Sequence, residues 1–329
     1  MGRQQDTNLE VKLERLRAEI NSGLSDLVKH HQPGELYDSV RYVLSGGGKR
    51  VRPVLLVLSA EVFGVGIRHT MPLALAVELI HNFSLVHDDI MDHADSRRGR
   101  KTVHVLWNID TAILCGDVLL ALAAECIGRA TSGDPAQLTR AFGRMIRELC
   151  EGQALDMVIG NSQNLTTDDY LHMVDGKTGG LLSASLEMGG IAGKADSDSC
   201  LALREAGKFI GRAFQINDDL LDLVADDQRW GKVQGGDLME GKGTYLLTEA
   251  RQRATGEDAT FFAGIYPGSG LTEEEIPKAR ARMEALGVLD AAREHVRSYT
   301  HRALDRIRSL SGNTTELHAL IQEIGSRIY

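Results

Sequence analysis

Apolar residues recur at helical spacing along most of the chain, with charged residues between them. This periodicity is typical of helices that bury one face. Glycine, proline and small polar residues separate the periodic stretches, as at Pro33-Gly34 and Ser132–Pro135. The helices that the pattern predicts cover residues 9–28, 36–44, 54–63, 73–95, 111–130, 135–156 and 201–224.

Later stretches are also predicted to be helical. Thr166–Asp169 opens a helix that the glycines of Asp175–Gly180 are expected to interrupt, and Thr272 with Glu275 forms a capping box after the loop Tyr266–Gly270. No stretch shows the alternation of a β-strand. We therefore predict an all-α bundle of ten or more helices around a central apolar cavity. No linker divides the chain, which predicts a single domain over residues 1–329.

Two of the apolar helices carry the pattern Asp-Asp-x-x-Asp near one end, at Asp88–Asp92 and, about 130 residues later, at Asp218–Asp222. An α-helix advances about 100° per residue, so the first and last aspartates of each motif share a face. That face continues through His81 below the first motif and Gln215 below the second. One such motif is also typical of a solvated acidic helix end. Because adjacent anions repel unless a cation lies between them, two copies favour a cation site.

Composition limits the possible partners. The net charge of −9 and an aromatic content of 5% argue against a nucleic-acid-binding protein. The N-terminus lacks the apolar core of a signal peptide, and we expect no transmembrane segment because no run approaches ~20 apolar residues. We also expect a cytoplasmic protein, because the cysteines lack C-x-x-C spacing and three of them lie in apolar stretches as core thiols. The cysteines are Cys115, Cys126, Cys150 and Cys200.

Basic residues lie in loops near the helix ends, including a basic loop over Arg97–Lys101. Carboxylate oxygens suit Mg²⁺, which takes substrate phosphates as further ligands. Arginine binds phosphate through two parallel hydrogen bonds and lysine binds it as a point charge. These groups predict a site for one or two diphosphates above an apolar cavity that accepts a hydrocarbon tail. The basic candidates are Lys49, Arg52, Arg97, Arg98, Lys177, Lys232 and Lys242.

At these positions the chain resembles the all-trans isoprenyl diphosphate synthases of the farnesyl and geranylgeranyl diphosphate synthase group, over about residues 20–325. It departs from that family at Trp230, where Phe is common, and at Tyr245–Leu247, where Leu-Pro is common. The motifs that carry the resemblance are Gly47–Pro53, His81, Asp88–Asp92, Arg97–Gly99, Lys177-Thr178, Gln215–Asp222, Gly231-Lys232 and Gly241–Thr244.

The resemblance implies a homodimeric prenyltransferase that joins isopentenyl diphosphate to a dimethylallyl, geranyl or farnesyl diphosphate by Mg²⁺-assisted ionisation. The implied metal ligands are Asp88, Asp92 and Asp218, and the implied catalytic residues are Asp88, Asp89, Asp92, Arg97, Lys177, Asp218, Asp219 and Asp222. Isopentenyl diphosphate would be bound by Lys49, Arg52, His81 and Arg98. The allylic diphosphate would be bound by Arg97, Lys177, Thr178, Gln215, Lys232 and Lys242.

Product length is expected to depend on Phe83 and Ser84, five and four residues before Asp88. The resemblance makes an aromatic residue at the first of these positions typical of geranylgeranyl-type enzymes, which implies a C20 product, with C15 the next candidate. Two other functions are weighed against this one, a terpene cyclase on a similar fold and a non-catalytic subunit of a heteromeric synthase. Cyclases generally lack the second aspartate motif, and non-catalytic subunits usually lose aspartates.

Overall fold

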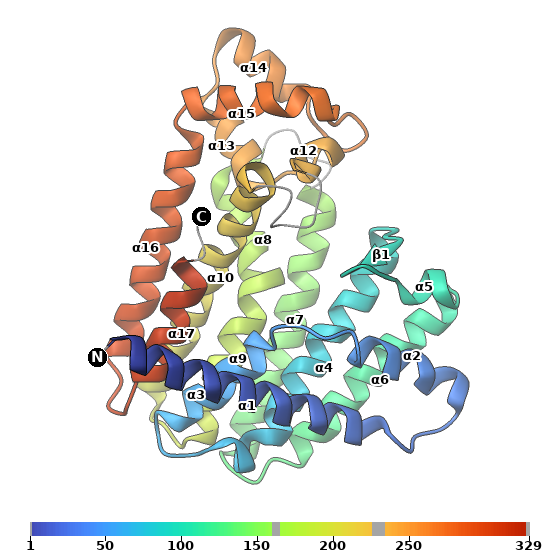
Figure 1. The fold of residues 1–329 in the computed structure, drawn as a ribbon, viewed down its shortest axis with the longest axis vertical. Helices are drawn as coiled ribbons and strands as arrows, with labels where there is room; N and C mark the ends of the chain where they lie inside the picture. Colours follow the sequence, from blue (N-terminus) through green and yellow to red (C-terminus); the bar gives the residue numbers. More distant parts are fainter. Residues whose placement is uncertain (1, 160–164, 226–233, 327–329) are drawn as a thin grey trace. The chain divides into compact units, whose positions relative to one another are not determined.

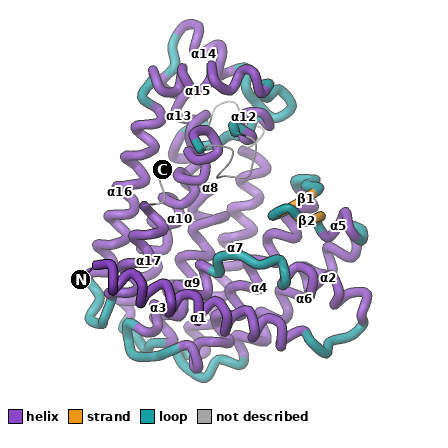
Figure 2. The backbone as a smooth tube through the Cα atoms, in the orientation of Figure 1, coloured by secondary structure: helices purple, strands orange, loops and turns teal. Residues whose placement is uncertain are grey.

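The computed structural model describes residues 2–159, 165–225 and 234–326. These residues are helical apart from one short hairpin and the turns, which confirms the predicted all-α class (Figures 1 and 2). The helices are α1 Gly2–Val28, α2 Gly34–Leu44, α3 Val51–Glu61, α4 Ile67–Met91, α5 Val103–Leu106, α6 Ile109–Gly128, α7 Pro135–Ile159, α8 Thr167–Val174, η1 Asp175–Gly179, α9 Gly180–Ala192, α10 Ser197–Val224, α12 Gly236–Glu240, α13 Tyr245–Arg253, α14 Gly256–Ala263, η2 Glu273–Glu275, α15 Ile276–Ala285, α16 Val288–Arg308 and α17 Thr315–Ser326.

The chain forms two compact units. Unit 1 comprises residues 1–146, 184–203 and 310–317, and unit 2 comprises residues 147–183, 204–309 and 318–329. Helices α7, α9, α10 and α17 therefore contribute residues to both units. The single domain over residues 1–329 stays a prediction.

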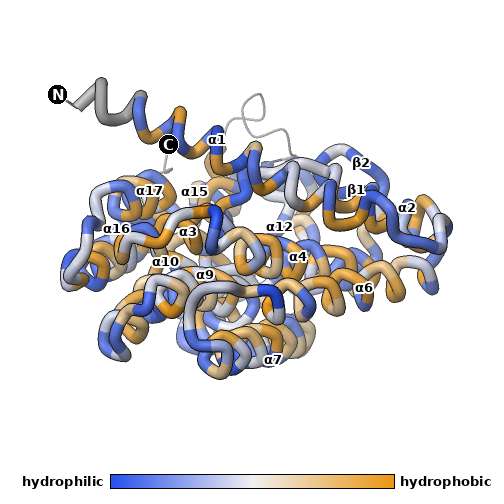
Figure 3. Tube along the Cα trace, turned by 90° about the horizontal axis from the view of Figure 1, so that it is seen from below, coloured by the Kyte–Doolittle hydropathy of each residue, from blue (hydrophilic) through white to orange (hydrophobic). Residues whose placement is uncertain are grey.

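Helix α4 forms the core of unit 1. It is buried along most of its length and packs against α6, α3 and α1. A helix that is apolar on nearly all sides is stable only inside a protein, which explains this position. Helix α1, by contrast, alternates polar and apolar turns (Figure 3). Helix α4 begins at Ile67 and ends at Met91, earlier at both ends than the predicted 73–95. Its last turn carries the first aspartate motif.

Helix α6 differs from its prediction. Its N-terminus is capped by Asn108, whose side chain accepts a hydrogen bond from Thr111 N. We expected a buried helix, but Ile109, Ile113 and Leu114 are about half exposed while the opposite side packs on α4. The expectation that no run approaches the length of a spanning helix is also wrong here. Helix α6 is long and apolar enough to cross a membrane, a test that core helices of soluble proteins also pass.

The basic loop folds into a hairpin that the sequence did not predict. Strands β1, Ser96–Arg97, and β2, Arg100–Lys101, pair antiparallel across a turn in which Arg98 and Gly99 have φ values of 53° and 72°. Glycine adopts this left-handed conformation without a steric cost, which favours a two-residue turn. Strands of two residues are too short to produce a visible alternation in the sequence.

Unit 2 contains a second difference from the predicted elements. Asp175–Gly179 does not interrupt the helix but forms one wider turn, a π-helix, between α8 and α9. Such turns insert an extra residue into a helix and are frequent at functional sites. The capping box predicted at Thr272 is confirmed, and the helix that starts after Thr166 is capped in the same way. Three cysteines are buried as predicted, whereas Cys150 is exposed.

Candidate active site

The first aspartate motif ends α4. Asp88 is half-buried and Asp92 is exposed, and Asp92 N donates to Asp88 O across one turn at 2.8 Å, so both side chains leave the helix on one side. Carboxylates at a helix C-terminus add to the negative end of the helix dipole. This arrangement is unfavourable unless a cation compensates it, and the residues therefore fit a divalent ion.

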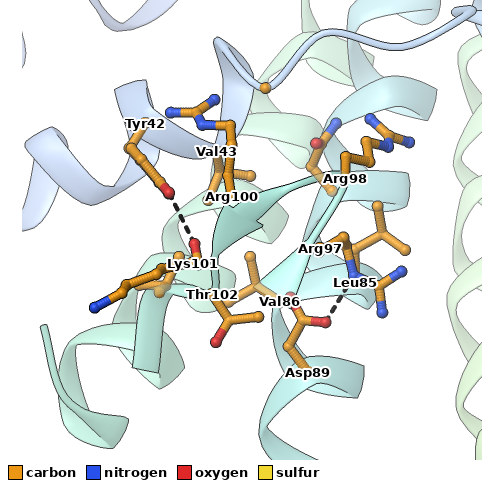
Figure 4. A pocket seen from close by; sticks show the side chains of 13 residues that line it. Tyr42, Val43, Leu85, Val86, Asp89, Arg97, Arg98, Arg100, Lys101 and Thr102 are labelled. Carbon is orange, nitrogen blue, oxygen red and sulfur yellow. Dashed lines mark hydrogen bonds and ion pairs between the residues drawn. The ribbon is translucent and has the colours of Figure 1, made fainter. Parts of the chain in front are cut away.

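The middle aspartate of the first motif points elsewhere. Asp89 is buried and accepts a hydrogen bond at 2.6 Å from Arg97 Nε of strand β1 (Figure 4). Burial raises the pKa of Asp89, and the neighbouring guanidinium of Arg97 opposes that rise. The pair therefore ties the hairpin to α4. Asp89 acts as an anchor rather than as a group that faces solvent.

The second motif lies near the end of α10, in unit 2. Asp218 and Asp222 are half-buried, and Asp222 Oδ2 accepts from Asp237 N at 3.1 Å, which holds the start of α12. Asp219 is buried again. Its carboxylate accepts from Tyr170 Oη at 2.7 Å, from Tyr245 N at 2.8 Å and from Gln215 Nε2 at 3.1 Å.

Asp219 has no cation among these three partners, and burial raises its pKa to about 8. The charge of nearby Asp237 raises the pKa further, while the three donors lower it. Below that pH the protonated acid is the favoured form inside this network. Asp219 therefore joins α8, α10 and α13 through hydrogen bonds rather than through an ion pair.

The π-helix brings Thr178 to α10 and Lys177 to α7. Thr178 Oγ1 donates to Gln215 Oε1 at 3.0 Å, and Gln215 in turn donates to Asp219. Lys177 pairs with Asp156 of α7 at 2.5 Å. These contacts show that Thr178, Gln215 and Asp219 form one connected chain of hydrogen bonds in unit 2.

A cluster of cations lies in unit 1, above the middle of α4. Arg52 Nη1 lies 3.3 Å from His81 Nε2, and Arg52 Nε is buried without a hydrogen-bond partner among the described residues. Burial, then the charges of Arg52, Arg98, Arg50 and Arg97, hold the pKa of His81 well below its usual range. His81 is therefore neutral and can accept from Arg52. A buried donor without a partner, in a region of positive charge, fits an anion.

Arg98 belongs to the same cluster. It lies at the turn of the hairpin, its Nη1 donates to Gly47 O at 2.7 Å, and burial lowers its pKa. Lys49 lies exposed on the loop that carries Gly47. The four residues predicted to bind isopentenyl diphosphate therefore all belong to unit 1 and lie on α3, α4, the hairpin and the glycine loop.

Comparison with known proteins decides the family. The polyprenyl synthetase family model matches residues 33–283. The chain belongs to the polyprenyl synthetase family. It is 37% identical to the geranylgeranyl diphosphate synthase of Methanosarcina mazei over 88% of each chain. The geranylgeranyl pyrophosphate synthetase structure from Pyrococcus horikoshii superposes with a TM-score of 0.92 at 34% identity, over 98% of this chain and 99% of that one.

A polyprenyl synthase from Caulobacter crescentus, complexed with calcium and isoprenyl diphosphate, is 30% identical. It superposes with a TM-score of 0.87 over 98% of this chain and 97% of that one. The matches confirm the predicted isoprenoid synthase fold and a trans-prenyltransferase, an enzyme that acts with a divalent metal. They give no support to a terpene cyclase or a non-catalytic subunit.

The residues present fit the metal that the family uses. Among the described residues, no three His, Cys, Asp or Glu side chains gather closely enough to hold an ion alone. Magnesium is usually held by one or two carboxylates and completes its shell with water and substrate phosphates. Asp88 and Asp92 in unit 1, and Asp218 in unit 2, are therefore each suited to binding an ion that also takes diphosphate oxygens as ligands.

Of the two remaining residues predicted to bind the allylic diphosphate, the structure describes Lys242 but not Lys232. Lys232 lies outside the described residues, as do Trp230 and Gly231. Lys242 is exposed and pairs with Glu240 at 2.5 Å and, more distantly, with Asp237.

The two predicted length determinants lie on α4 in unit 1. Phe83 is buried and its ring meets that of His87 edge to face at 4.7 Å. His87 Nε2 lies 3.3 Å from Ile113 O, so this side of α4 packs on α6. Ser84 is also buried and donates to His81 O at 2.9 Å. Their role in product length stays a prediction.

Some residues that shape the site were missed. Tyr170 gave no signal because a single tyrosine in a helical stretch is ordinarily a core residue. Tyr245 was noticed as a departure from the family, but its backbone contact with Asp219 could not be read from sequence. Tyr42 and Arg100, which line the pocket of Figure 4 beside Arg98, were also missed.

Proposed function

We propose that this prenyltransferase condenses isopentenyl diphosphate with an allylic diphosphate, with Mg²⁺ as its metal and geranylgeranyl (C20) diphosphate as its main product. The observation that carries the proposal is the buried Nε of Arg52, which has no hydrogen-bond partner in the described part of the chain and lies beside neutral His81. An anion with several oxygens, such as a diphosphate, would satisfy that donor and offset the crowded positive charge.

The two substrates are bound by different sets of residues. Lys49, Arg52, His81 and Arg98 bind the isopentenyl diphosphate in unit 1. Lys177, Thr178 and Gln215 of unit 2, with Arg97, Lys232 and Lys242, bind the allylic diphosphate. When bound, Mg²⁺ stabilises the charge that develops on the departing diphosphate. The cationic side chains add to that stabilisation in the same way. The isopentenyl double bond then attacks the allylic carbon, and the product loses a proton to the released diphosphate.

Product analysis tests this function. The protein is incubated with labelled isopentenyl diphosphate and a geranyl or farnesyl primer, with Mg²⁺ or with excess chelator, and the products are separated by chromatography. We expect a linear C20 diphosphate from either primer and none in chelator. A cyclic hydrocarbon, or no elongation unless another chain is added, would overturn the proposal.

Kinetics test the division of residues. Lys49→Ala and Arg52→Ala are expected to raise KM mainly for isopentenyl diphosphate, and Lys177→Ala mainly for the allylic substrate. Binding that is equal in the ground and transition states appears in KM rather than in kcat. The reverse pairing would show that the two substrates are exchanged.

We further propose that a second copy of the chain covers the exposed side of α6. Val105, Leu106, Ile109, Ile113 and Leu114 are all at least 39% exposed, and they lie on α5 and α6, which pack on each other. Contiguous exposed apolar surface is typical of association. Sedimentation is expected to show a dimer that Leu114→Asp converts to a monomer, and a wild-type monomer would refute this.

The free cysteines suit a reducing compartment, so we propose a cytoplasmic location.

A further inference from the structure

The hairpin that carries Arg98 is held to α2 at its strand ends. Tyr42 of α2 donates its hydroxyl proton to Lys101 O at 2.8 Å (Figure 4). The guanidinium of Arg100 lies over the Tyr42 ring, 3.8 Å from its centroid, and Arg100 Nη1 lies 3.4 Å from Ser45 Oγ. One aromatic side chain therefore contacts the hairpin through both its face and its hydroxyl.

The turn of the hairpin is held separately, to the glycine loop. Arg98 Nη1 donates to Gly47 O, and a Cβ added to Gly48 would lie 2.9 Å from that same Nη1. Gly48 also has a φ of 135°, which side chains rarely tolerate. Glycine at position 48 thus leaves the space that the Arg98 guanidinium occupies beside this loop.

These two attachments have different consequences for the two arginines of the hairpin. Arg97 is anchored to α4 by its own ion pair with Asp89. Arg98 has no such carboxylate partner among the described residues, and it donates to a backbone carbonyl, Gly47 O. The position of Arg98 therefore depends on the rest of the hairpin more than that of Arg97 does.

We propose that Tyr42 and Arg100 form a latch that positions Arg98 for isopentenyl diphosphate. Both are positioning residues, because they act through the hairpin and not through contact with the substrate. The inference rests on the proposed function, which assigns Arg98 to that substrate. A two-stranded hairpin is marginally stable by itself. The cation–π contact between Arg100 and Tyr42 therefore supplies a significant part of the free energy that stabilises it.

The test compares two neighbouring residues of β2. Arg100→Met removes a positive charge and the contact with Tyr42, whereas Lys101→Met removes a charge from an exposed side chain and leaves the backbone acceptor of Tyr42 in place. We expect Arg100→Met to raise KM for isopentenyl diphosphate about tenfold, and Lys101→Met less than about twofold. KM for the allylic substrate is expected to change far less in both.

Tyr42 gives a graded second series. Tyr42→Phe keeps the ring and loses the hydroxyl, so we expect a rise of about threefold. Tyr42→Leu loses both contacts and should raise KM at least as much as Arg100→Met. Arg100→Lys keeps a cation above the ring and should recover part of the loss. Melting temperatures show whether each variant is folded in the assay. Equal KM values for Arg100→Met and Lys101→Met, or equal rises for both substrates, would overturn the latch.

Amide hydrogen exchange over residues 96–102 separates failure of the latch from failure of the proposed function, because it needs no turnover. Faster exchange in Arg100→Met than in Lys101→Met supports the latch, and the same rate in both refutes it. If wild type does not elongate isopentenyl diphosphate, the proposed function fails, and the exchange result still decides whether the latch exists. The emission of Trp107, whose ring lies edge-on to Tyr42 at 5.4 Å, reports the same change.

Discussion

The two aspartate motifs have the same spacing, but their buried middle residues are stabilised in different ways. In unit 1, Asp89 is paired with a cation, the guanidinium of Arg97. In unit 2, Asp219 is surrounded by three hydrogen-bond donors, a tyrosine hydroxyl, an amide side chain and a backbone N–H. Burial raises the pKa of both, and that of Asp219 reaches about 8.

The difference teaches that the repeated motif contains two kinds of aspartate. The middle one turns into the protein and fixes neighbouring elements, by charge in one unit and by neutral hydrogen bonds in the other. The outer ones stay half-buried or exposed. The three aspartates of a motif are therefore not equivalent ligands. The first motif supplies the candidate ligands Asp88 and Asp92 and the second supplies Asp218, while each middle aspartate is an anchor.

Removing an outer aspartate should have the largest effect. Asp88→Ala and Asp218→Ala are each expected to lower kcat by about 10² or more, the scale for losing one preorganised group that stabilises charge. The fold should survive, because each change also removes repulsion between neighbouring anions. Steady-state kinetics check this, with the exposed Asp26→Ala as a control of equal charge change. Full activity of either variant would contradict the proposed role of the outer aspartates in holding the metal.

Substitution of the middle aspartates should lower the unfolding free energy by different amounts in the two units. Asp89→Asn leaves Arg97 without its carboxylate and is expected to cost about 1–3 kcal/mol of unfolding free energy. Asp219→Asn keeps an oxygen acceptor and resembles the protonated acid that dominates at neutral pH, so a loss below about 1 kcal/mol is expected. Urea unfolding at neutral pH measures both. A larger loss for Asp219→Asn would show that charge, not hydrogen bonding, stabilises unit 2.

The sequence predicted what depends on local pattern. The apolar periodicity of α4 and α10 and the aspartate spacing at their ends were sufficient to place both motifs on helices and to identify the outer faces. The partners of the middle aspartates could not be predicted, because Arg97, Tyr170 and Tyr245 approach them through tertiary packing. The hairpin could not be predicted for the same reason, because its strands are held by Tyr42 of α2, a helix distant in the sequence.

Product length should be controlled from unit 1 alone. Phe83 and Ser84 lie five and four residues before Asp88. Five residues before Asp218 stands Ala213, which offers no comparable bulk, and Phe214 four residues before it is exposed. Phe83→Ala is expected to lengthen the product and Ser84→Phe to shorten it. Chromatography and melting curves decide between this role and simple packing. Unchanged products from a Phe83→Ala protein that has lost ~3–5 kcal/mol would refute the assignment.

The smallest effect is a difference in pH dependence. Folded Asp219 keeps its proton up to about pH 8 while the unfolded chain releases it near 3.8, so its contribution to stability is lost as pH rises through that window. His81 behaves oppositely. Its pKa is lowered from 6.5 on folding, so its contribution is lost as pH falls below 6.5.

Unfolding free energies in chelator, across acidic to alkaline pH, check both slopes. Asp219→Asn should flatten the loss of stability as pH rises from 3.8 to about 8, and His81→Gln should flatten the loss as pH falls below 6.5. If each variant kept the wild-type slope, the two residues would not titrate as their surroundings indicate.

Binding of Mn²⁺, followed by electron paramagnetic resonance in the presence of inorganic diphosphate, tests most directly the claim that the outer aspartates hold the ion and the middle ones do not. We predict that Asp88→Asn and Asp218→Asn each weaken this binding about tenfold or more, the effect of losing one charge-assisted contact. Asp89→Asn and Asp219→Asn should stay within about threefold of wild type. Loss of Mn²⁺ binding in the middle variants, with binding retained in the outer ones, would contradict the account.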